Sequence, residues 1–203
     1  MREYEVVSAP YNRLTFMLSL PRSRSAWMAE FLRPFCASAS WHCPLQQCAS
    51  IEELGAKVDN IGRASPGRIF IADVAAMFFF DRLLARFPGA QYLVVHRPAR
   101  EVENSMRQLG ITPPLNVRKA ERQLLDIGES IRMQPWAMTG TYFELHSPQV
   151  LSAICRFATG AVPPPRHLHD MMQRKVEVSI ADQRLHTDVA KQRALFGQAR
   201  IIH

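Results

Sequence analysis

Residues 14–27 read LTFMLSLPRSRSAW, an unbroken apolar run that gives way abruptly to a polar loop. A run such as Leu14–Leu20 is typical of a strand that is buried on both faces of a sheet. From Ser25 to Phe35 the apolar side chains recur every three or four residues, which predicts a helix that Ser25 can cap. The stretch therefore predicts a strand, a tight polar loop and a helix in direct succession.

The same alternation continues along the chain. Short apolar runs predict further strands, and apolar side chains at helical spacing predict the helices between them. The expected strands are 68–72, 91–96 and 141–145, and the expected helices are 75–87, 99–109, 117–132 and 148–158, with another helix opening at the capping pattern Ser50-Ile51-Glu52-Glu53. This order predicts an α/β fold, in which a parallel β-sheet is flanked by helices.

The length of 203 residues suits one domain with a substantial core and is too short for two ordinary ones. We expect a single α/β domain over residues 1–178 and a polar helical or mobile tail over residues 179–203. No apolar run reaches the roughly 18 residues that a membrane span needs, and the N-terminal segment lacks the apolar core of a signal peptide. A cytoplasmic protein with no membrane partner is therefore expected.

The basic side chains are strongly biased toward arginine. The sequence holds 21 Arg and 4 Lys against 18 acidic residues, a net charge of +7. Because guanidinium groups bind phosphate and sulfate through forked hydrogen bonds, this bias favours an anionic ligand. Aromatic and basic residues are not interleaved in a stripe, which makes nucleic acid an unlikely partner.

The four cysteines form no recognisable disulfide or zinc pattern. Cys36, Cys43 and Cys48 lie near His42, but their spacing is too loose to indicate a metal site, and Cys155 is remote. Buried free thiols and no metal are expected.

The loop between the first strand and its helix is a candidate anion site. Backbone N–H groups and the helix dipole favour an anion there, Arg22 and Arg24 add charge, and Ser23 and Ser25 add hydroxyl donors. The loop lacks the pattern GxxxxGK[ST], which disfavours an ordinary ATP- or GTP-binding P-loop.

The run LSLPRSRSAW resembles the 5′-phosphosulfate loop of sulfotransferases that use 3′-phosphoadenosine-5′-phosphosulfate (PAPS). The resemblance places Arg22 on the 5′-phosphate and on the bridging oxygen of the sulfuryl group, beside Ser23 and Ser25. It places Trp27 on the adenine ring. Arg24 stands where most members have glycine and Ala26 where many have threonine, a departure similar to that of small bacterial and phage-encoded members.

A second loop resembles the 3′-phosphate signature of the same family. Arg97 ends a predicted strand and Ser105 follows eight positions later, as in that signature, although Pro98 lies one place earlier than usual. The segments around residues 68–98 and 142–160 also follow the family's order of elements. The resemblance covers residues 14–178, weakly over 36–66, and implies a P-loop type fold.

Two residues are candidates for the catalytic base that the resemblance implies. Asp73 follows the predicted strand 68–72, so topology places it at the edge of the sheet where ligands bind. His42 has the better intrinsic pKa, but the path of its segment is not evident from sequence. Position favours Asp73 narrowly, and the alternatives are a helix cap for Asp73 and a core or surface histidine for His42.

The sequence therefore predicts a PAPS-dependent sulfotransferase that needs no metal. The acceptor is expected to be a hydroxyl or amine of a small molecule or glycan, bound by the segments 36–66 and 110–140, and neither the acceptor nor the oligomeric state is indicated. One alternative is a P-loop nucleotide kinase or nucleotide binder, which would require magnesium. Another is a basic interaction protein whose nucleotide site has decayed.

Overall fold

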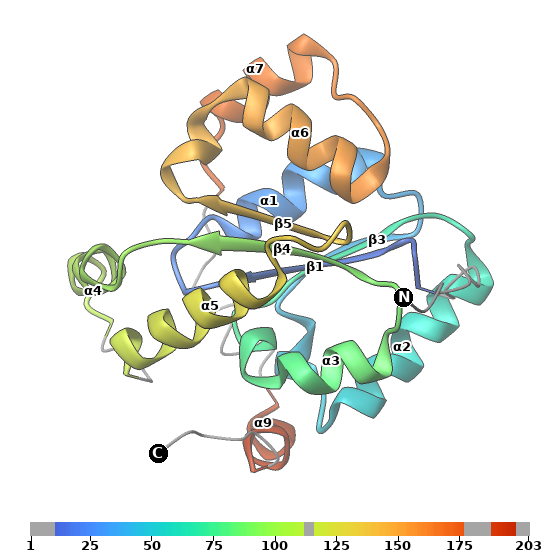
Figure 1. The fold of residues 1–203 in the computed structure, drawn as a ribbon, viewed down its shortest axis with the longest axis vertical. Helices are drawn as coiled ribbons and strands as arrows, with labels where there is room; N and C mark the ends of the chain where they lie inside the picture. The colour runs from blue at the N-terminus through green and yellow to red at the C-terminus, as the bar shows by residue number, and fades with distance from the viewer. Residues whose placement is uncertain (1–10, 112–115, 177–187, 198–203) are drawn as a thin grey trace.

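A five-stranded parallel sheet lies at the centre of the computed structural model, which describes residues 11–111, 116–176 and 188–197 (Figure 1). The strand order is β2-β3-β1-β4-β5, and every neighbouring pair is parallel. This architecture confirms the predicted α/β fold. The strands are β1 Leu14–Ser19, β2 Ala39–His42, β3 Ile69–Ala72, β4 Gln91–His96 and β5 Ala137–Thr141.

Strand β1 occupies the middle of the sheet because its side chains are suited to burial on both faces. All six of its residues are buried. Thr15 pairs with Phe70 of β3 on one side and with Gln91 of β4 on the other. The loop that leaves β1 is therefore flanked by the carboxyl ends of two further strands, which is where ligands bind in folds of this class.

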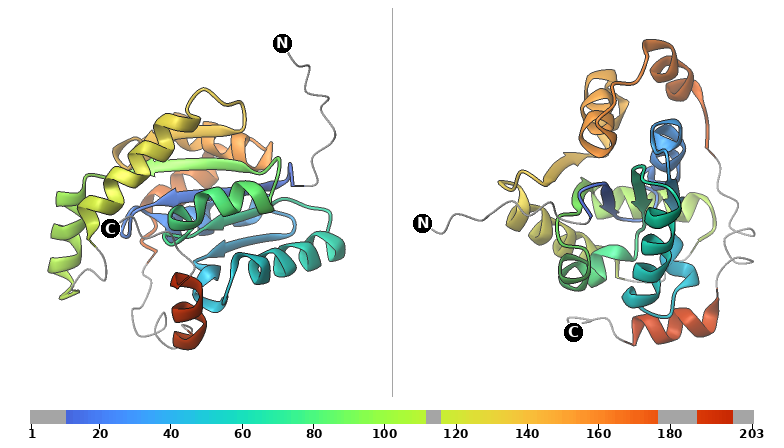
Figure 2. Two further views of the ribbon diagram at one scale, coloured as in Figure 1. Left: turned by 60° about the horizontal axis from the view of Figure 1, so that its bottom comes forward. Right: turned by 90° about the vertical axis from the view of Figure 1, so that its right-hand side faces the viewer.

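Helices cover both faces of the sheet (Figures 1 and 2). On one face, α1, α6 and α7 enclose a core that includes Phe31 and Ile154; on the other, α2, α3, α5 and α9 enclose a second core that includes Phe16 and Leu124. The helices are α1 Ser25–Leu32, α2 Ile51–Ala64, α3 Phe80–Arg86, α4 Ala99–Gln108, α5 Val117–Ile131, α6 Pro148–Thr159, α7 Pro165–Gln173 and α9 Val189–Phe196, with short 3₁₀ turns η1 Arg33–Phe35, η2 Pro44–Gln47, η3 Ala76–Phe79 and η4 Phe143–His146.

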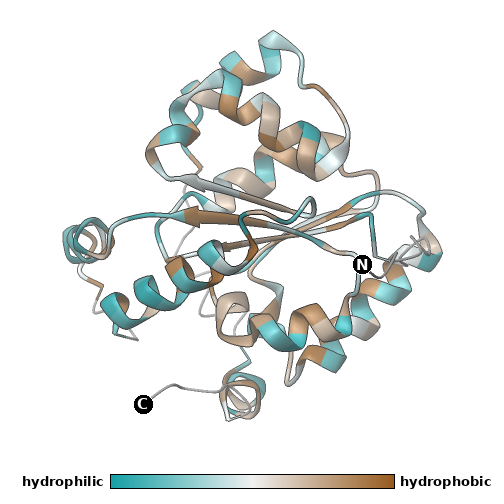
Figure 3. Ribbon diagram, viewed as in Figure 1, coloured by the Kyte–Doolittle hydropathy of each residue, from teal (hydrophilic) through white to brown (hydrophobic). Residues whose placement is uncertain are grey.

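Hydropathy explains why the central elements were recognisable. The central strands carry mostly apolar residues, whereas several of the helices alternate between apolar and polar residues (Figure 3). The predicted capping pattern of α2 is confirmed, because Ser50 Oγ accepts a hydrogen bond from Glu53 N at 3.2 Å and Glu53 Oε2 accepts one from Ala49 N at 2.8 Å.

Two local predictions were wrong, and one strand was missed. The strand expected at residues 141–145 is the turn η4, and the last strand, β5, ends at Thr141. The edge strand β2 was not predicted, because its sequence ASWH mixes polar and apolar residues. The helix expected from residue 75 opens with the turn η3 before α3 begins at Phe80.

The segment predicted as a polar helical or mobile tail contributes a packed helix. In α9 the side chain of Leu195 is fully buried in the second core. Residues 112–115, 177–187 and 198–203 lie outside the described residues. Over the described ranges, no helix is both long and apolar enough to cross a lipid bilayer.

Candidate functional site

The loop after β1 reaches helix α1 through two residues with left-handed backbone. Arg22 has φ 63° and Arg24 has φ 62°. Arg24 occupies the N-cap position and Ser25 is already helical, so the predicted cap by Ser25 was wrong. The first turn of α1 closes with a hydrogen bond from Met28 N to Arg24 O at 2.8 Å. The backbone N–H groups before Met28, including that of Ala26, have no hydrogen-bond partner within the helix. Such N–H groups are the donors that bind an anion at the start of a helix.

The side chain of Arg24 turns away from the loop. Its Nη1 donates to the carbonyl oxygen of Leu145 at 3.1 Å, and its guanidinium lies 5.0 Å from the centroid of the Trp27 ring. These contacts explain how the loop holds an arginine at a left-handed position that glycine would fill more easily.

The left-handed backbone predicts an unusual order of stability for two variants. Both Arg24→Ala and Arg24→Gly remove the contacts with Leu145 and Trp27, but only glycine relieves the steric cost of positive φ. We expect the free energy of unfolding of Arg24→Gly to exceed that of Arg24→Ala by about 1 kcal/mol. Urea denaturation of the two proteins checks this, and a more stable alanine variant would show that the loop does not need the left-handed conformation.

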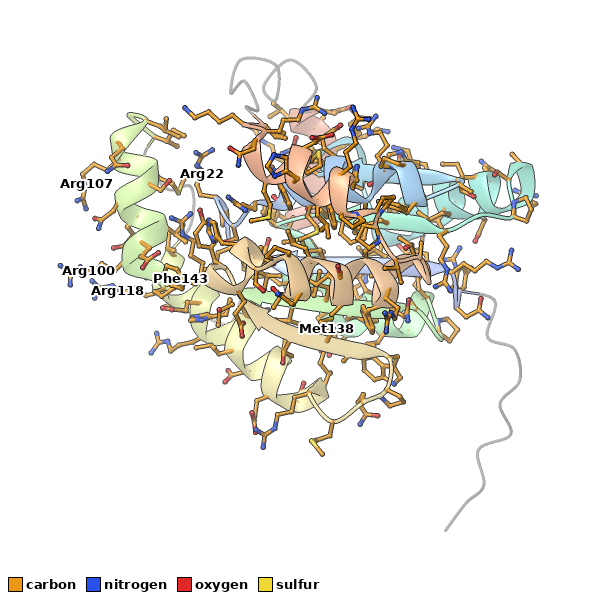
Figure 4. The ribbon with its side chains drawn as sticks, turned by 90° about the horizontal axis from the view of Figure 1, so that it is seen from above. Arg22, Arg100, Arg107, Arg118, Met138 and Phe143 are labelled. Atoms are coloured by element: carbon orange, nitrogen blue, oxygen red, sulfur yellow. The ribbon has the colours of Figure 1, made fainter. Side chains whose placement is uncertain are left out.

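The loop after β4 meets the loop after β1. Arg97 directly follows β4, and its Nη1 donates to the carbonyl oxygen of Arg22. Ser105 lies on α4, and its Oγ accepts a hydrogen bond from Arg22 Nε at 3.4 Å. Arg22 and the exposed side chains of α4 gather at one end of the molecule (Figure 4). The fold thus brings together Arg22, Arg97 and Ser105 from segments about 80 residues apart in the chain.

Two buried polar atoms in these loops have no hydrogen-bond partner. Ser23 Oγ and Arg97 Nε are among the four such side-chain atoms in the described part of the chain, the others being those of Ser19 and Tyr92. Arg97 Nε lies 3.5 Å from Glu101 Oε2, within an ion pair but outside hydrogen-bond geometry. Because unsatisfied buried donors are costly, both atoms fit a site that an anion completes.

Tyr142 is a site residue that the sequence analysis missed. The Arg97 guanidinium lies 4.0 Å from the centroid of the Tyr142 ring, and that of Arg24 lies 6.0 Å away. The ring therefore helps to orient both arginines. An aromatic residue one place beyond the end of a strand is the signal that could have found it.

Trp27 lies in the core beneath α7. Only 5% of its surface is exposed, its Nε1 donates to the carbonyl oxygen of Met171 at 3.1 Å, and its ring stacks on Phe31. The guanidinium of Arg24 lies over the indole as well. Adenine stacking by Trp27 stays a prediction, and it would require Arg24 to leave this position.

His42 contacts the loop after β1. It is the last residue of β2, and its Nε2 lies 3.1 Å from Ser25 Oγ and 3.3 Å from Cys43 Sγ. Burial lowers the pKa of the imidazole from 6.5 to about 4, because the charged form loses its hydration. At neutral pH the ring is therefore uncharged, and the same burial makes it a weaker base than an exposed imidazole.

Asp73 has contacts that hold a turn together. Its side chain is buried, its Oδ1 accepts from Ala75 N at 2.8 Å and its Oδ2 accepts from Leu45 N at 2.8 Å. Burial raises the pKa of the carboxyl from 3.8 to about 6, and the two backbone hydrogen bonds oppose this rise. The role of Asp73 as a base stays a prediction, but His42 is the candidate whose ring contacts Ser25.

The low pKa of His42 also predicts how stability depends on pH. Between about pH 4 and 6.5 the unfolded chain binds a proton at this histidine and the folded protein does not, so acid favours unfolding. Asp73 has the opposite effect on stability. Between pH 3.8 and about 6 its carboxyl group is protonated in the folded protein and ionised in the unfolded chain, so acid favours folding.

We therefore expect His42→Gln to gain stability relative to the wild type as the pH falls. The difference in unfolding free energy between the two proteins should shift in favour of the variant by about 2–3 kcal/mol between neutral pH and about pH 4.5. Comparing the two proteins cancels the contribution of Asp73. Urea denaturation at both pH values checks this, and a constant difference would contradict the lowered pKa.

The cysteines and acids give no sign of a metal centre. All four cysteines are free and buried, as predicted. No group of three or more His, Cys, Asp or Glu side chains in ranges 11–111, 116–176 and 188–197 is placed to hold a metal ion.

The fold resembles that of sulfotransferase domains. The sulfotransferase domain of the curacin biosynthetic pathway is 17% identical with a TM-score of 0.53, over 79% of this chain and 78% of that domain. The sulfotransferase domain of the Synechococcus PCC 7002 olefin synthase is 14% identical with a TM-score of 0.55, over 91% of this chain and 97% of that domain. No protein-family model matches the chain, and no curated protein matches it by sequence.

Proposed function

We propose that the chain binds PAPS at the carboxyl end of β1 and β4 and transfers its sulfuryl group to a hydroxyl or amine. The observation that carries this proposal is the meeting of two anion loops. Arg22 from the first loop and Ser105 on the helix after the second lie 3.4 Å apart, while Arg97 binds the carbonyl oxygen of Arg22. Adjacent sites for two anions suit a nucleotide with separate 5′- and 3′-phosphates.

The residues of the first loop would hold the 5′ end of the nucleotide. Arg22 supplies a guanidinium, Ser23 supplies a hydroxyl with no partner of its own, and the first turn of α1 supplies backbone N–H groups, including that of Ala26. A cation there stabilises the negative charge that develops on a departing phosphate. Bound PAPS would supply the activated sulfuryl group.

The residues of the second loop would hold the 3′-phosphate. Arg97 is fixed by the Tyr142 ring and by Glu101, so its guanidinium is already oriented. Its Nε has no hydrogen-bond partner in the described structure, but it lies 3.5 Å from Glu101 Oε2, so an anion at this atom would replace or share that carboxylate. Ser105 lies within reach of Arg22 and adds a hydroxyl donor.

His42 would accept the proton of the acceptor group. With the ring proton on Nδ1, the lone pair of Nε2 faces Ser25, whose hydroxyl donates to it and orients the ring. As the acceptor oxygen or nitrogen attacks, Ser25 would pass its hydroxyl proton to Nε2 and take up the proton of the acceptor, which leaves the imidazole charged. Ser25 would thus relay the proton to the base, and its single hydroxyl proton would not be shared with the anion at the same time.

The nucleotide that the protein prefers tests this function. We expect 3′-phosphoadenosine 5′-phosphate to bind more tightly than 5′-AMP by about 1.5–3 kcal/mol, or roughly 10–150-fold, without a need for magnesium. In Arg97→Ala the two affinities should become similar, while Arg100→Ala removes an exposed arginine from α4, the helix that follows, and should retain the preference. Isothermal titration measures all of these affinities.

Other outcomes would point to the alternatives. Tighter binding of ATP that depends on magnesium would favour a nucleotide kinase. Absence of nucleotide binding would favour a basic interaction protein. Equal affinity of the wild type for the bisphosphate and 5′-AMP would leave Arg97 and Ser105 without the proposed ligand.

A further inference from the structure

The C-terminal helix α9 contacts the turns that follow two neighbouring strands at the candidate site. The turn η2 follows β2 and therefore His42, and the turn η3 follows β3 and therefore Asp73. Gln192 Nε2 on α9 donates to the carbonyl oxygen of Leu45 in η2 at 2.9 Å. The ring of Phe196 packs against Phe78 and Phe79 of η3.

The turn η2 begins with a residue in an unfavourable backbone conformation. Cys43 has φ 52°, in the left-handed region that residues other than glycine rarely adopt. This conformation places Cys43 Sγ 3.3 Å from His42 Nε2. Such strain persists only where the surrounding structure fixes the backbone.

Contacts from two sides fix this backbone. From the sheet, Cys43 N donates to Ala72 O at 2.8 Å and Leu45 N donates to the Asp73 carboxylate at 2.8 Å. From α9, Gln192 binds Leu45 O, and Asp188 N donates to Gln46 O at 3.3 Å. The turn that follows His42 is therefore held between Asp73 and α9.

We infer that α9 is a positioning element of the site: it holds η2 in its left-handed conformation and so keeps His42 against Ser25. Gln192 acts on the turn directly, and Leu195 anchors the helix in the core. The inference rests on the proposed function in that His42 is taken as the proton acceptor. Residues 188–197 would thus contribute to sulfuryl transfer indirectly, by positioning His42, and would not contact the nucleotide.

The buried cysteines provide a test that needs no ligand. Cys43 and Cys48 lie at the two ends of η2, whereas Cys36 and Cys155, the latter on α6, belong to the core on the other face of the sheet. In Leu195→Ala, we expect a thiol reagent to modify Cys43 and Cys48 at least about tenfold faster than in the wild type, while the other two thiols stay protected. Peptide mass spectrometry locates the label.

Two further variants of the full chain distinguish the loss of the contact between α9 and η2 from a general loss of stability. Gln192→Ala should accelerate the same two thiols less strongly, and Arg193→Ala, on the exposed side of α9, should leave all four unchanged. Equal acceleration of all four thiols in Leu195→Ala and Gln192→Ala would indicate global opening, and no acceleration in either would show that α9 does not hold the turn. Either of these two results would overturn the inference.

Nucleotide binding and the His42 ring complete the test. In Leu195→Ala the affinity for 3′-phosphoadenosine 5′-phosphate should equal that of the wild type, while the NMR-measured pKa of His42 should rise toward 6.5 and single-turnover transfer should slow about tenfold or more. An unchanged His42 pKa with faster thiol labelling would also overturn the inference. Failure of the wild type to bind the nucleotide would instead contradict the proposed function, while the thiol result would stand separately.

Discussion

Replacing His42 with glutamine is expected to slow sulfuryl transfer by about 10²–10⁴-fold, the usual cost of losing a general base. Glutamine is close in size and can still hydrogen-bond to Ser25, but it cannot take up the proton of the acceptor. Nucleotide affinity should hardly change. The His42 ring contacts Ser25 and Cys43, and Ser25 is the one residue of the two anion loops to which it is hydrogen-bonded in the described structure. Single-turnover transfer of labelled sulfate from PAPS to an acceptor identified by screening measures the effect.

Two further variants test whether the loss of transfer is specific to His42. His167→Gln removes a part-buried histidine whose ring binds the carbonyl oxygen of Phe31 in the other core, and it should leave transfer intact. Asp73→Asn tests the base that topology favours. Near-normal transfer by His42→Gln, together with a large loss in Asp73→Asn, would reverse the assignment.

Replacing Arg22 with alanine is expected to lower the rate of transfer by about 10²–10³-fold. Alanine keeps a side chain at the left-handed position, so the backbone strain is similar and the variant isolates the guanidinium. The cation that stabilises the leaving phosphate is lost, together with the hydrogen bond to Ser105. The same single-turnover assay, at saturating PAPS, separates this loss from weaker binding.

Changing a distant arginine provides the control for net charge. Arg63 lies on α2 and contacts Asp59 and Asn60, so Arg63→Ala removes one positive charge away from the two loops. Arg22→Lys should recover part of the rate, because it restores charge without the forked donor geometry. A normal rate in Arg22→Ala would remove this residue from the proposed mechanism.

The sequence predicts the centre of the fold better than its edges. Strands β1 and β4 are continuous apolar runs, and their predicted positions agree with the structure to within one residue. Strands β2 and β5 lie at the sheet edges and are partly exposed, so their residues carry less of the apolar signal. Edge strands depend on pairing with a neighbour that is distant in sequence.

The residues of the candidate site also fall into those that the sequence predicts and those that it does not. The two anion loops could be predicted because each lies next to a strong strand and carries its own charged residues. The contact of His42 with Ser25 could not, since it depends on how β2 pairs with β3. The burial of Trp27 likewise depends on α7, more than 130 residues further along the chain.

The central position of β1 has a consequence for synthesis on the ribosome. Its two partner strands are made much later: Thr15 pairs with Phe70, which is 70 − 15 = 55 residues downstream, and hydrogen-bonds to Gln91, which is 76 residues downstream. At about 5–20 residues per second, the second partner emerges roughly 4–15 s after β1. Until β3 emerges, the run LTFMLSL has no parallel strand to pair with, and until β4 emerges one of its edges stays open, so this segment of the nascent chain is a candidate for chaperone binding.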